Sequence, residues 1–400
     1  MSITCAVPPR IEAGSRELRR LNLAMLAAGL SAFALLYATQ ALLPEIGVEF
    51  GVGATTASLT VSVTTGVLAL TVLPMSAMAE RLGRTRVMTA GLAVAAVSVV
   101  AGAAAPGFGS FLALRALDGL ALAAVVAVAV GHIGDEVETG ASGAAIGVYV
   151  SGTTVGGLLG RLVPAGVSEV ASYRWSMAAL GLVGAVGAAV FTLLAAPARH
   201  RPSPDGGRAA IGRQLADPGI RRLCGAAVLL MGGFVGTYNF LTFRLGRAPF
   251  DWSPAVVGLV FLAYLAGTVT STVAARRAAR HGPRAVVLAG AVLATAGLAL
   301  TVPDTPLTVL PGLVVFTAGF FAAHSVASGW AATRAVDHRS QAAALYLMAY
   351  YVGSCVGGTA LGLAWSAGGW PATVLVVGCC YLAAAVLVTD VPGGRRDQRV

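Results

Sequence analysis

Long apolar runs separated by short polar segments occupy most of this chain. Each run is long enough to cross a hydrocarbon core of ~30 Å as a helix of about 20 residues. The runs lie at about 21–43, 57–79, 87–105, 111–131, 143–164 and 174–196, and then at 223–243, 255–275, 285–302, 307–330, 342–364 and 370–389. They lack the alternation of barrel strands, and backbone amides in lipid must pair internally, so we predict twelve transmembrane helices.

The two halves of the chain resemble each other. The stretch YVSGTTVGG at 149–157 returns 201 residues later as YYVGSCVGG at 350–358. Tyr37 matches Tyr238 at the same interval. Repeated sets of apolar helices are typical of secondary transporters, whose sites lie between the repeats. We therefore predict an all-α polytopic membrane protein built from two six-helix pseudo-repeats.

Domain boundaries follow from the polar segments. We predict a cytoplasmic N-terminal segment at 1–20, a bundle at 21–196, a cytoplasmic linker at 197–222, a second bundle at 223–389 and a cytoplasmic tail at 390–400. The linker is long and polar enough to let two bundles move separately. The remaining loops are short and leave no room for a soluble catalytic domain. We predict that the protein is not an enzyme and needs no cofactor.

Composition and charge support a membrane location. The chain is 57% hydrophobic and 11% charged, whereas soluble domains carry roughly 25% charged residues. All 27 basic residues are Arg, and 22 of them lie near the termini, in the linker or in alternate loops, while the opposite loops carry acids such as Glu45. The positive-inside rule then predicts that both termini lie on the cytoplasmic side of the membrane. We expect that membrane to be a bacterial inner membrane. The net charge of +10 therefore sets topology, and no nucleic-acid partner is expected.

The turn after the second run carries a dense set of charges. Gly83 permits a tight reversal between two helices, and a carboxylate beside it can cap a neighbouring helix or pair with Arg at an inner gate. The residues concerned are Glu80, Arg81, Gly83, Arg84 and Arg86. Simple anchoring by positive charge is the alternative interpretation.

An acidic patch lies at the predicted cytoplasmic end of the fourth helix. Asp135, Glu136 and Glu138 occur where Arg would be expected. They are placed to pair with Arg84 or Arg86 and so to close an inner gate. A solvated loop is the alternative.

The fourth run contains two charged residues at membrane depth. Inserting an Arg at the centre of a membrane helix costs ~2.5–3.5 kcal/mol on insertion scales, and Arg115 is a functional candidate for that reason. Asp118, three residues on, shares its helical face and is the only carboxylate in a predicted span. We expect Asp118 to carry a proton and Arg115 to regulate it, with a static ion pair as the alternative. His324, the only His in a predicted span, is a further proton candidate, although a lone His is more often a packed residue.

Glycines recur at four-residue spacing in the fifth and eleventh runs. Such spacing lets helix backbones approach closely, and plain packing explains it as well as an interface that rocks. The residues are Gly152, Gly156 and Gly157, followed by Arg161, and then Gly353, Gly357 and Gly358. Arg161 lies near the outer end of its helix, where it can snorkel outward or face a cavity.

The first and seventh runs correspond in the repeat, and we predict that they form cavity walls. Amphipathic and amide groups on apolar helices would provide a few orienting contacts. The candidate cavity residues are Tyr37, Gln40, Tyr149, Tyr238, Asn239, Arg244 and Tyr350.

Over about 20–390 the chain resembles transporters of the major facilitator superfamily. Residues 76–86 are similar to the family's loop motif G-x-L-A-D-R-x-G-R-K/R, with Glu80 in place of Asp. The fourth run resembles the pattern R-x-x-q-G with Asp118 at the Gln position, and residues 147–157 resemble the antiporter motif G-x-x-x-G-P-x-x-G-G with Thr153 in place of Pro. Residues 36–44, 152–161 and 230–234 further resemble the branch of proton-driven drug or sugar exporters that includes the YnfM-like inner-membrane proteins. The resemblance implies two six-helix bundles that rock around a midplane cavity.

The favoured function is proton-coupled efflux of a small organic molecule by a monomer in the lipid bilayer. The alternative is an importer or facilitator of a small metabolite or organic anion, in which Arg115, Arg161 or Arg244 holds negative charge, because the Arg fork suits a carboxylate. The five Cys show no paired spacing, so no disulfide framework or metal site is expected.

Overall fold

The computed structural model describes residues 10–199, 207–335 and 339–391. Their contacts divide the chain into two compact units. Unit 1 holds the described residues of 1–39 and 70–204, and unit 2 holds those of 40–69 and 205–400. The outer parts of the predicted N-terminal segment and tail, and the middle of the predicted linker, lie outside the described residues.

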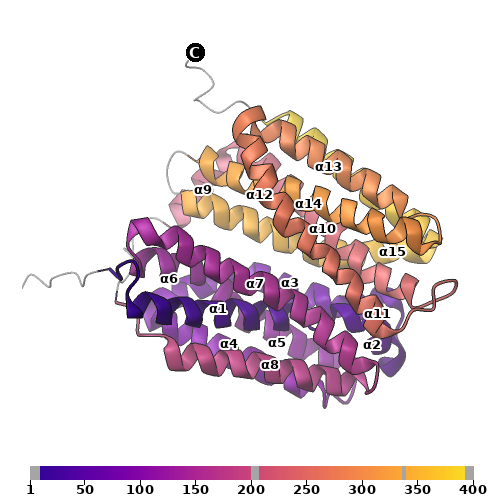
Figure 1. Cartoon of the computed structure of the whole chain (residues 1–400), viewed down its shortest axis with the longest axis horizontal. Coiled ribbons are helices and arrows are strands. Elements are labelled where there is room, and N and C mark those ends of the chain that lie inside the picture. The colour runs from indigo at the N-terminus through magenta and orange to yellow at the C-terminus, as the bar shows by residue number, and fades with distance from the viewer. Residues whose placement is uncertain (1–9, 200–206, 336–338, 392–400) are drawn as a thin grey trace, which may run out of the picture. The chain divides into compact units, whose positions relative to one another are not determined.

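Unit 1 is a bundle of helices in which α1 packs on α7 and α8, and α4 packs on α5 and α8 (Figure 1). Its helices are α1 (Arg16–Leu36), the second half of α3 (Ala54–Leu82), α4 (Arg84–Gly102), α5 (Phe108–Val126), α6 (Ala129–Glu136), α7 (Thr139–Ser168) and α8 (Tyr173–Leu194). The side chain of Ser15 caps α1 by accepting a hydrogen bond from the Leu18 amide.

Unit 2 is organised around α10, which packs along α15, while α14 packs on α12 and α13. Its elements are η1 (Gln40–Leu42), α2 (Leu43–Phe50), the first half of α3, α9 (Gly207–Ala216), α10 (Pro218–Leu245), α11 (Pro254–Leu259), η2 (Val260–Ala263), α12 (Tyr264–His281), α13 (Pro283–Leu300), α14 (Pro306–Arg334) and α15 (Arg339–Thr389). Within this unit, Ser62 of α3 accepts a hydrogen bond from Thr359 of α15 at 2.7 Å. By their contacts, residues 40–69 group with the later part of the chain. The predicted boundaries of the two bundles stay a prediction.

Eleven helical segments in the described part of the chain are long and apolar enough to cross a membrane. The last of them, residues 341–389, contains a non-helical break at Gly368 and Gly369. Gly369 has φ +61°, a conformation that suits glycine. The break separates two predicted runs, so the prediction of twelve helices is confirmed.

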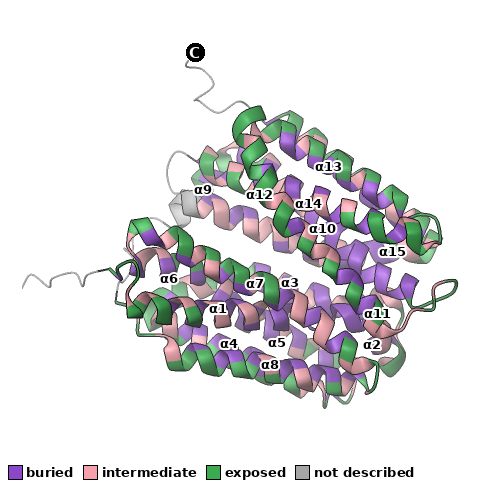
Figure 2. Ribbon diagram, viewed as in Figure 1, coloured by how far each residue is buried: buried purple, intermediate pink, exposed green. Residues whose placement is uncertain are grey.

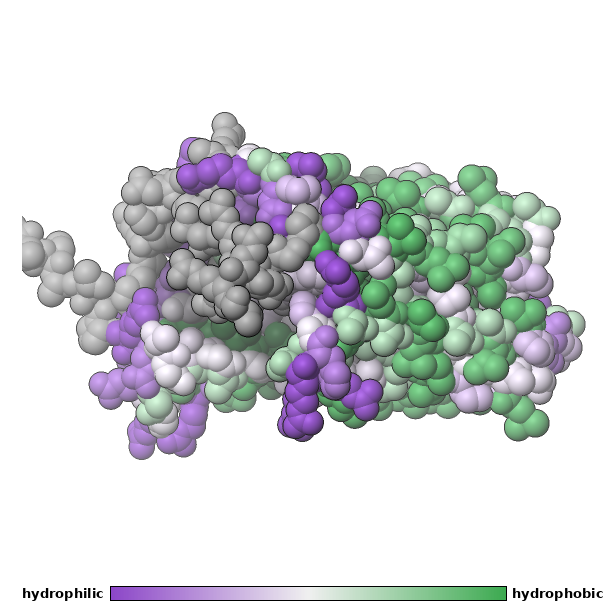
Figure 3. Space-filling view, turned by 90° about the horizontal axis from the view of Figure 1, so that it is seen from above, coloured by the Kyte–Doolittle hydropathy of each residue, from purple (hydrophilic) through white to green (hydrophobic). Residues whose placement is uncertain are grey.

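Large apolar side chains are exposed along the helices, as expected for a surface solvated by lipid. The most exposed include Leu70, Leu193, Leu307, Leu363 and Leu375. Buried and exposed residues are interspersed along most of the helices in Figure 2, whereas residues 230–245 of α10 are buried throughout. On the face shown in Figure 3, apolar side chains cover most of the right-hand half, and the most hydrophilic side chains lie to the left and in a band near the middle.

Three predicted spans are interrupted rather than continuous. The first span stops at Leu36 and resumes through η1 and α2, where Pro44 occupies the first turn. Pro44 lacks an amide proton and its ring clashes with the preceding turn, so the helix must restart there. The fourth span breaks between α5 and α6, and the eighth contains the 3₁₀ turn η2.

The glycines of the fifth run allow α7 to lie directly against α1. A Cβ added at Gly156 would overlap the backbone of Leu30, and Gly152 and Gly160 meet the backbone of α1 one turn away on either side. The side chain of Tyr149 is buried in the same helix, and its carbonyl approaches Gly29 of α1.

The corresponding glycines of the eleventh run act in the same way in unit 2. A Cβ at Gly357 of α15 would overlap Gly232 of α10, and one at Gly353 would overlap the backbone of Val228. Gly358 instead faces Ser62 and Asn239. The sequence repeat therefore corresponds to one helix pair, α1–α7 or α10–α15, present in each unit.

Candidate functional site

A buried ion pair lies on α5 of unit 1. Arg115 Nη1 is 2.6 Å from Asp118 Oδ2, and both residues are almost completely enclosed, with exposures of 1% and 0%. The i, i+3 spacing places both side chains on one helical face, as the sequence predicts. Removing one member of such a pair would leave an uncompensated charge in an apolar interior.

Arg115 also caps the broken first span. Its Nη1 donates to the carbonyl of Leu35 at 3.3 Å, and its Nη2 donates to that of Leu36 at 2.9 Å. These carbonyls belong to the last turn of α1, where backbone acceptors lack intrahelical partners and a cation is favoured. The interruption of α1 is therefore stabilised by a side chain from another helix, which no local sequence signal could reveal.

Asp118 uses only one of its two carboxylate oxygens. Oδ2 accepts from Arg115, whereas Oδ1 is buried and has no hydrogen-bond partner among the described residues. A carboxylate accepts at both oxygens, and a protonated one gains an O–H donor. Oδ1 is thus an open position for a proton beside a fixed cation.

Arg161 approaches the same end of α1. Its guanidinium lies 4.2 Å from the centroid of the Tyr37 ring and donates to the carbonyl of Gly157. A cation over an aromatic face is attracted by the ring quadrupole. Arg161 is buried, so it points into unit 1 rather than outward to an interface.

Polar groups on the seventh span form specific contacts within unit 2. Gln40 Nε2 donates to Asn239 Oδ1 at 2.8 Å, and Asn239 Nδ2 donates to the carbonyl of Gly358 at 3.3 Å. The Tyr238 hydroxyl lies 2.7 Å from Thr317 Oγ1. The structure therefore brings together Gln40 and Asn239, which the sequence only assigned to paired walls.

An aromatic cluster surrounds Tyr238 and involves four helical elements of unit 2. Phe234 stacks on Phe320 with centroids 3.8 Å apart, and the Tyr238 ring is 4.8 Å from that of Tyr264. The cluster consists of Phe234, Tyr238, Phe261, Tyr264, Phe316, Phe320 and Phe321. No member is charged, so this region provides stacking surface rather than ion pairing.

His324 extends the cluster toward α15. Its ring is parallel to that of Phe320 at 5.5 Å and lies 4.6 Å from that of Tyr350. Its Nδ1 is 3.1 Å from the Tyr346 hydroxyl, which in turn donates to the His324 carbonyl at 3.3 Å. His324 and Tyr350 are both partly exposed.

Arg244 is committed to a loop of unit 2. It donates to the carbonyls at Thr301, Val302 and Pro303, and its Nη2 is 2.7 Å from Asp304 Oδ1. These acceptors follow the last turn of α13, so Arg244 acts as a cap there. This geometry favours a structural role over the cavity role expected from the sequence.

The charged turn after α3 surrounds a pocket of about 240 Å3, lined by residues 79–86 together with 197–198. Gly83 has φ +98°, which accounts for glycine at this turn. Arg84 pairs with Asp135 at 2.5 Å, as the acidic patch suggested. Glu80, Arg81 and Arg86 are exposed at the rim.

The other acidic residues of this patch form a second connection. Glu136 Oε1 accepts from the amide of Arg199 at 2.8 Å, and the backbone of Glu136 pairs with Ile11. Glu136 is therefore bound to the chain beyond α8.

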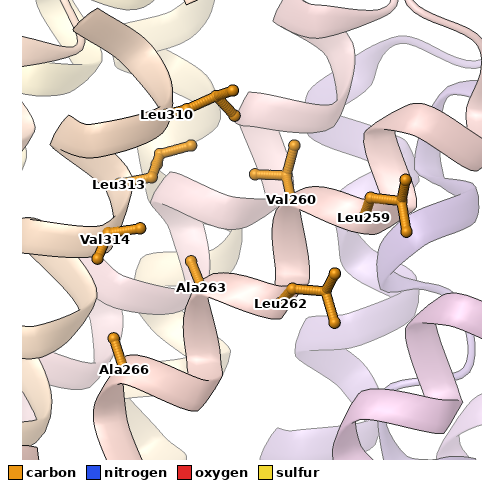
Figure 4. Close-up of a pocket in the computed structure, with 8 residues that line it drawn as sticks. All are labelled: Leu259, Val260, Leu262, Ala263, Ala266, Leu310, Leu313 and Val314. Carbon is orange, nitrogen blue, oxygen red and sulfur yellow. The ribbon is translucent and has the colours of Figure 1, made fainter.

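A second pocket, of about 390 Å3, lies between α11–α12 and α14 (Figure 4). Its lining is entirely apolar: Leu259, Val260, Leu262, Ala263, Ala266, Leu310, Leu313 and Val314. A ligand site needs some polar groups to orient its occupant. We therefore assign this groove to the lipid-exposed surface.

Two buried titratable residues lie just beyond the predicted spans, each after a helix break. His132 is buried in α6, which follows the break in the fourth span. Glu45 lies in α2, which follows the break in the first span, and its Oε2 is buried without a partner in the described part of the chain. The ends predicted for these two spans stay predictions.

Each unit contains one such helix pair, with a charged cluster in unit 1 and an aromatic cluster in unit 2, and known proteins show the same kind of sequence. The sequence profile described as Major Facilitator Superfamily matches residues 24–248 and 245–398. The chain belongs to the major facilitator superfamily. It is 34% identical over 379 residues to an uncharacterized transporter of that type, YybF of Bacillus subtilis (strain 168), covering 94% of each chain. It is also 34% identical to the inner membrane transport protein YnfM of Escherichia coli (strain K12), covering 90% of this chain and 87% of YnfM.

Solved structures support the same fold. The nucleoside transporter NupG (D323A mutant) superposes with a TM-score of 0.77 at 13% identity, covering 93% of this chain and all of NupG. A bacterial homolog of the lysosomal transporter Spinster superposes with a TM-score of 0.71 at 16% identity, covering 94% and 95%. The protein is a multi-pass membrane transporter, and the prediction that it is not an enzyme is confirmed by its family.

Proposed function

We propose that this transporter exports a small organic molecule in exchange for protons, by alternating access. The observation that carries the proposal is the enclosed Arg115–Asp118 pair, in which Asp118 Oδ1 is open. A carboxylate at membrane depth is a functional candidate because it is costly to keep there. Beside a permanent cation, its charge can be gained and lost without leaving an isolated anion.

The proton can be linked to a conformational change through Arg115. While Asp118 is ionised, Arg115 is shared between that carboxylate and the carbonyls of Leu35 and Leu36. Protonation of Asp118 removes its charge and shifts Arg115 toward the end of α1. The contacts of Arg115 with the end of α1 then differ between the two protonation states of Asp118. A proton therefore shifts the equilibrium between the two conformations of the transporter by the difference in free energy of those contacts.

The substrate surface that we propose lies in unit 2. Small-molecule sites are mainly apolar and aromatic with a few orienting polar groups. The aromatic cluster with His324 and Tyr350 has that composition. A further relative supports efflux: the puromycin resistance protein Pur8 of Streptomyces alboniger is 28% identical over 343 residues, covering 70% of this chain and 68% of Pur8.

The alternative, import of an organic anion, requires a cation free to receive it. Arg115 and Arg244 each have an Asp partner and backbone acceptors already. The remaining candidate is Arg161, which is engaged by Tyr37 and Gly157. The pairing of these cations favours a neutral or cationic substrate over an anion.

The test is flux in liposomes that contain a pH dye, with compounds screened under an imposed proton gradient. Asp118→Asn removes the titratable group, whereas Asp304→Asn makes the same chemical change at a carboxylate that also pairs with an Arg but is 60% exposed. We expect substrate-dependent proton movement in wild type and Asp304→Asn and its loss in Asp118→Asn. Substrate flux without proton movement in the wild type would contradict antiport and favour a facilitator.

A further inference from the structure

The pattern of α14 and α15 places two matched residue pairs opposite each other. Phe320 and His324 are four residues apart on α14, and Tyr346 and Tyr350 are four residues apart on α15. This spacing puts each pair on one helical face. The His324 ring contacts all three of the others, at centroid distances between 4.6 and 5.6 Å.

The hydrogen bonds of Tyr346 fix the protonated nitrogen of His324. The Tyr346 hydroxyl has one proton and lies within bonding distance of both the His324 carbonyl and His324 Nδ1. Both contacts can be hydrogen bonds only if the hydroxyl donates to the carbonyl and accepts from Nδ1–H. Neutral His324 then carries its proton on Nδ1 and has an acceptor lone pair on Nε2.

The Nε2 atom is available to a ligand. It makes no hydrogen bond to any described residue and is not among the enclosed polar atoms. The neighbouring side chains of Tyr264, Phe321 and Tyr350 are also partly exposed, whereas Phe234 and Phe320 behind them are buried. The open acceptor therefore lies beside the partly accessible ring of Tyr350. Tyr264 and Phe321, whose ring centroids are 6.2 Å apart, provide further partly accessible rings in the same aromatic cluster.

We propose that His324, Phe321, Tyr264 and Tyr350 form a recognition subsite for planar aromatic molecules that carry one N–H or O–H donor. The ring of the ligand stacks on the aromatic side chains, and its donor bonds to His324 Nε2. None of these four side chains is a carboxylate or Arg, so the subsite selects by shape and by the donor rather than by net charge. This inference names the substrate class of the proposed exporter and therefore rests on that function.

Two fluorescent probes that differ in one donor test the subsite: 2-naphthol, which has an O–H, and 2-methoxynaphthalene, which has the same ring without it. Binding is measured to the full-length protein in lipid nanodiscs, with nanodiscs alone as the partition control. We expect the wild type to bind the naphthol on the order of 3- to 10-fold more tightly, as for one neutral hydrogen bond. Equal binding of the two probes would overturn the proposal.

Variants separate the acceptor from the stacking surface. His324→Phe keeps a ring against Phe320 and should abolish the preference for the naphthol, while His324→Gln, with an amide oxygen, should restore part of it. Tyr350→Leu should weaken both probes by the same factor and leave the preference intact. A preference that persists in His324→Phe, or binding that is unchanged in Tyr350→Leu, would contradict the assignment.

The measurement needs no proton gradient, so it is independent of the coupling test. A naphthol preference that depends on His324, found together with flux that moves no proton, would refute antiport and leave the subsite standing. Proton-coupled flux with no preference between the probes would refute the subsite alone.

Discussion

The two units contain the same helix pair but surround it with different chemistry. In unit 1, α7 lies against α1 through Gly156, and in unit 2, α15 lies against α10 through Gly357. The tyrosines that correspond in the repeat differ in their surroundings. Tyr37 lies under the guanidinium of Arg161, whereas Tyr238 is among aromatic rings and bonds to Thr317.

This difference shows which part of the repeat is constrained. Glycine is required where backbones touch, because any Cβ would overlap the partner helix. Side chains beside that contact are free to diverge, and they have become charged in unit 1 and aromatic in unit 2. We interpret this as a division of labour, with the proton handled in unit 1 and the substrate ring in unit 2.

The largest effect is expected from Arg115→Leu. The variant leaves Asp118 without its buried cation and removes the Arg115 bond to the Leu36 carbonyl, and breaking such a pair costs about 3–5 kcal/mol. The temperature at which the solubilised protein loses its monodisperse elution peak should fall accordingly. The double variant Arg115→Leu with Asp118→Leu should recover much of the loss, because no charge remains buried.

Arg244→Leu is the matched change in unit 2. Its carboxylate partner Asp304 is largely exposed, so water can solvate it when Arg244 is removed. The free energy of unfolding should therefore fall only by the contribution of the hydrogen bonds to buried backbone carbonyls, about 1–3 kcal/mol. The same elution assay compares the two variants. If Arg244→Leu lowered thermal stability as much as Arg115→Leu does, the unpaired charge of Asp118 would carry no additional cost.

The glycine contacts should respond equally in the two units. Gly156→Ala and Gly357→Ala each force a methyl group into a neighbouring backbone, which costs about 1–3 kcal/mol. Gly147→Ala lies in α7 with open space at its Cβ and should be neutral or slightly stabilising. If only one of the two variants, Gly156→Ala or Gly357→Ala, lowered stability in the elution assay, the two units would not share the same helix contact.

The amide contact of Gln40 and Asn239 should contribute less than the ion pair. Asn239→Leu leaves the Gln40 amide without one partner, at a cost of about 1–3 kcal/mol. A double-mutant cycle with Gln40→Met isolates the pair from other effects. Thermal stability that is simply additive would show that the two amides do not interact.

The smallest effect belongs to the exposed end of unit 1. Arg84 pairs with Asp135, but the carboxylate is 40% exposed, and exposed ion pairs contribute about 0–1 kcal/mol. Asp135→Asn should leave stability within that range and become indistinguishable from wild type at high salt. A larger loss in the elution assay would assign this pair a structural role.

The spans and the glycine contacts were predictable because run length and four-residue spacing act locally. The Arg115–Asp118 pair was predictable for the same reason, since its members are three residues apart. The capping of α1 by Arg115 was not, because it depends on a tertiary contact between residues about 80 positions apart in the chain. The role of Arg244 and the convergence of four helical elements on the aromatic cluster around Tyr238 were hidden in the same way.

Infrared difference spectroscopy on a pH titration of the purified protein tests the central claim most directly. If Asp118 takes up and releases a proton, the wild type shows a protonated carboxyl band that is sensitive to deuterium exchange. That band should be lost in Asp118→Asn and kept in Asp304→Asn. A spectrum of Asp118→Asn that matches the wild type would contradict the account, because the proton would then bind elsewhere.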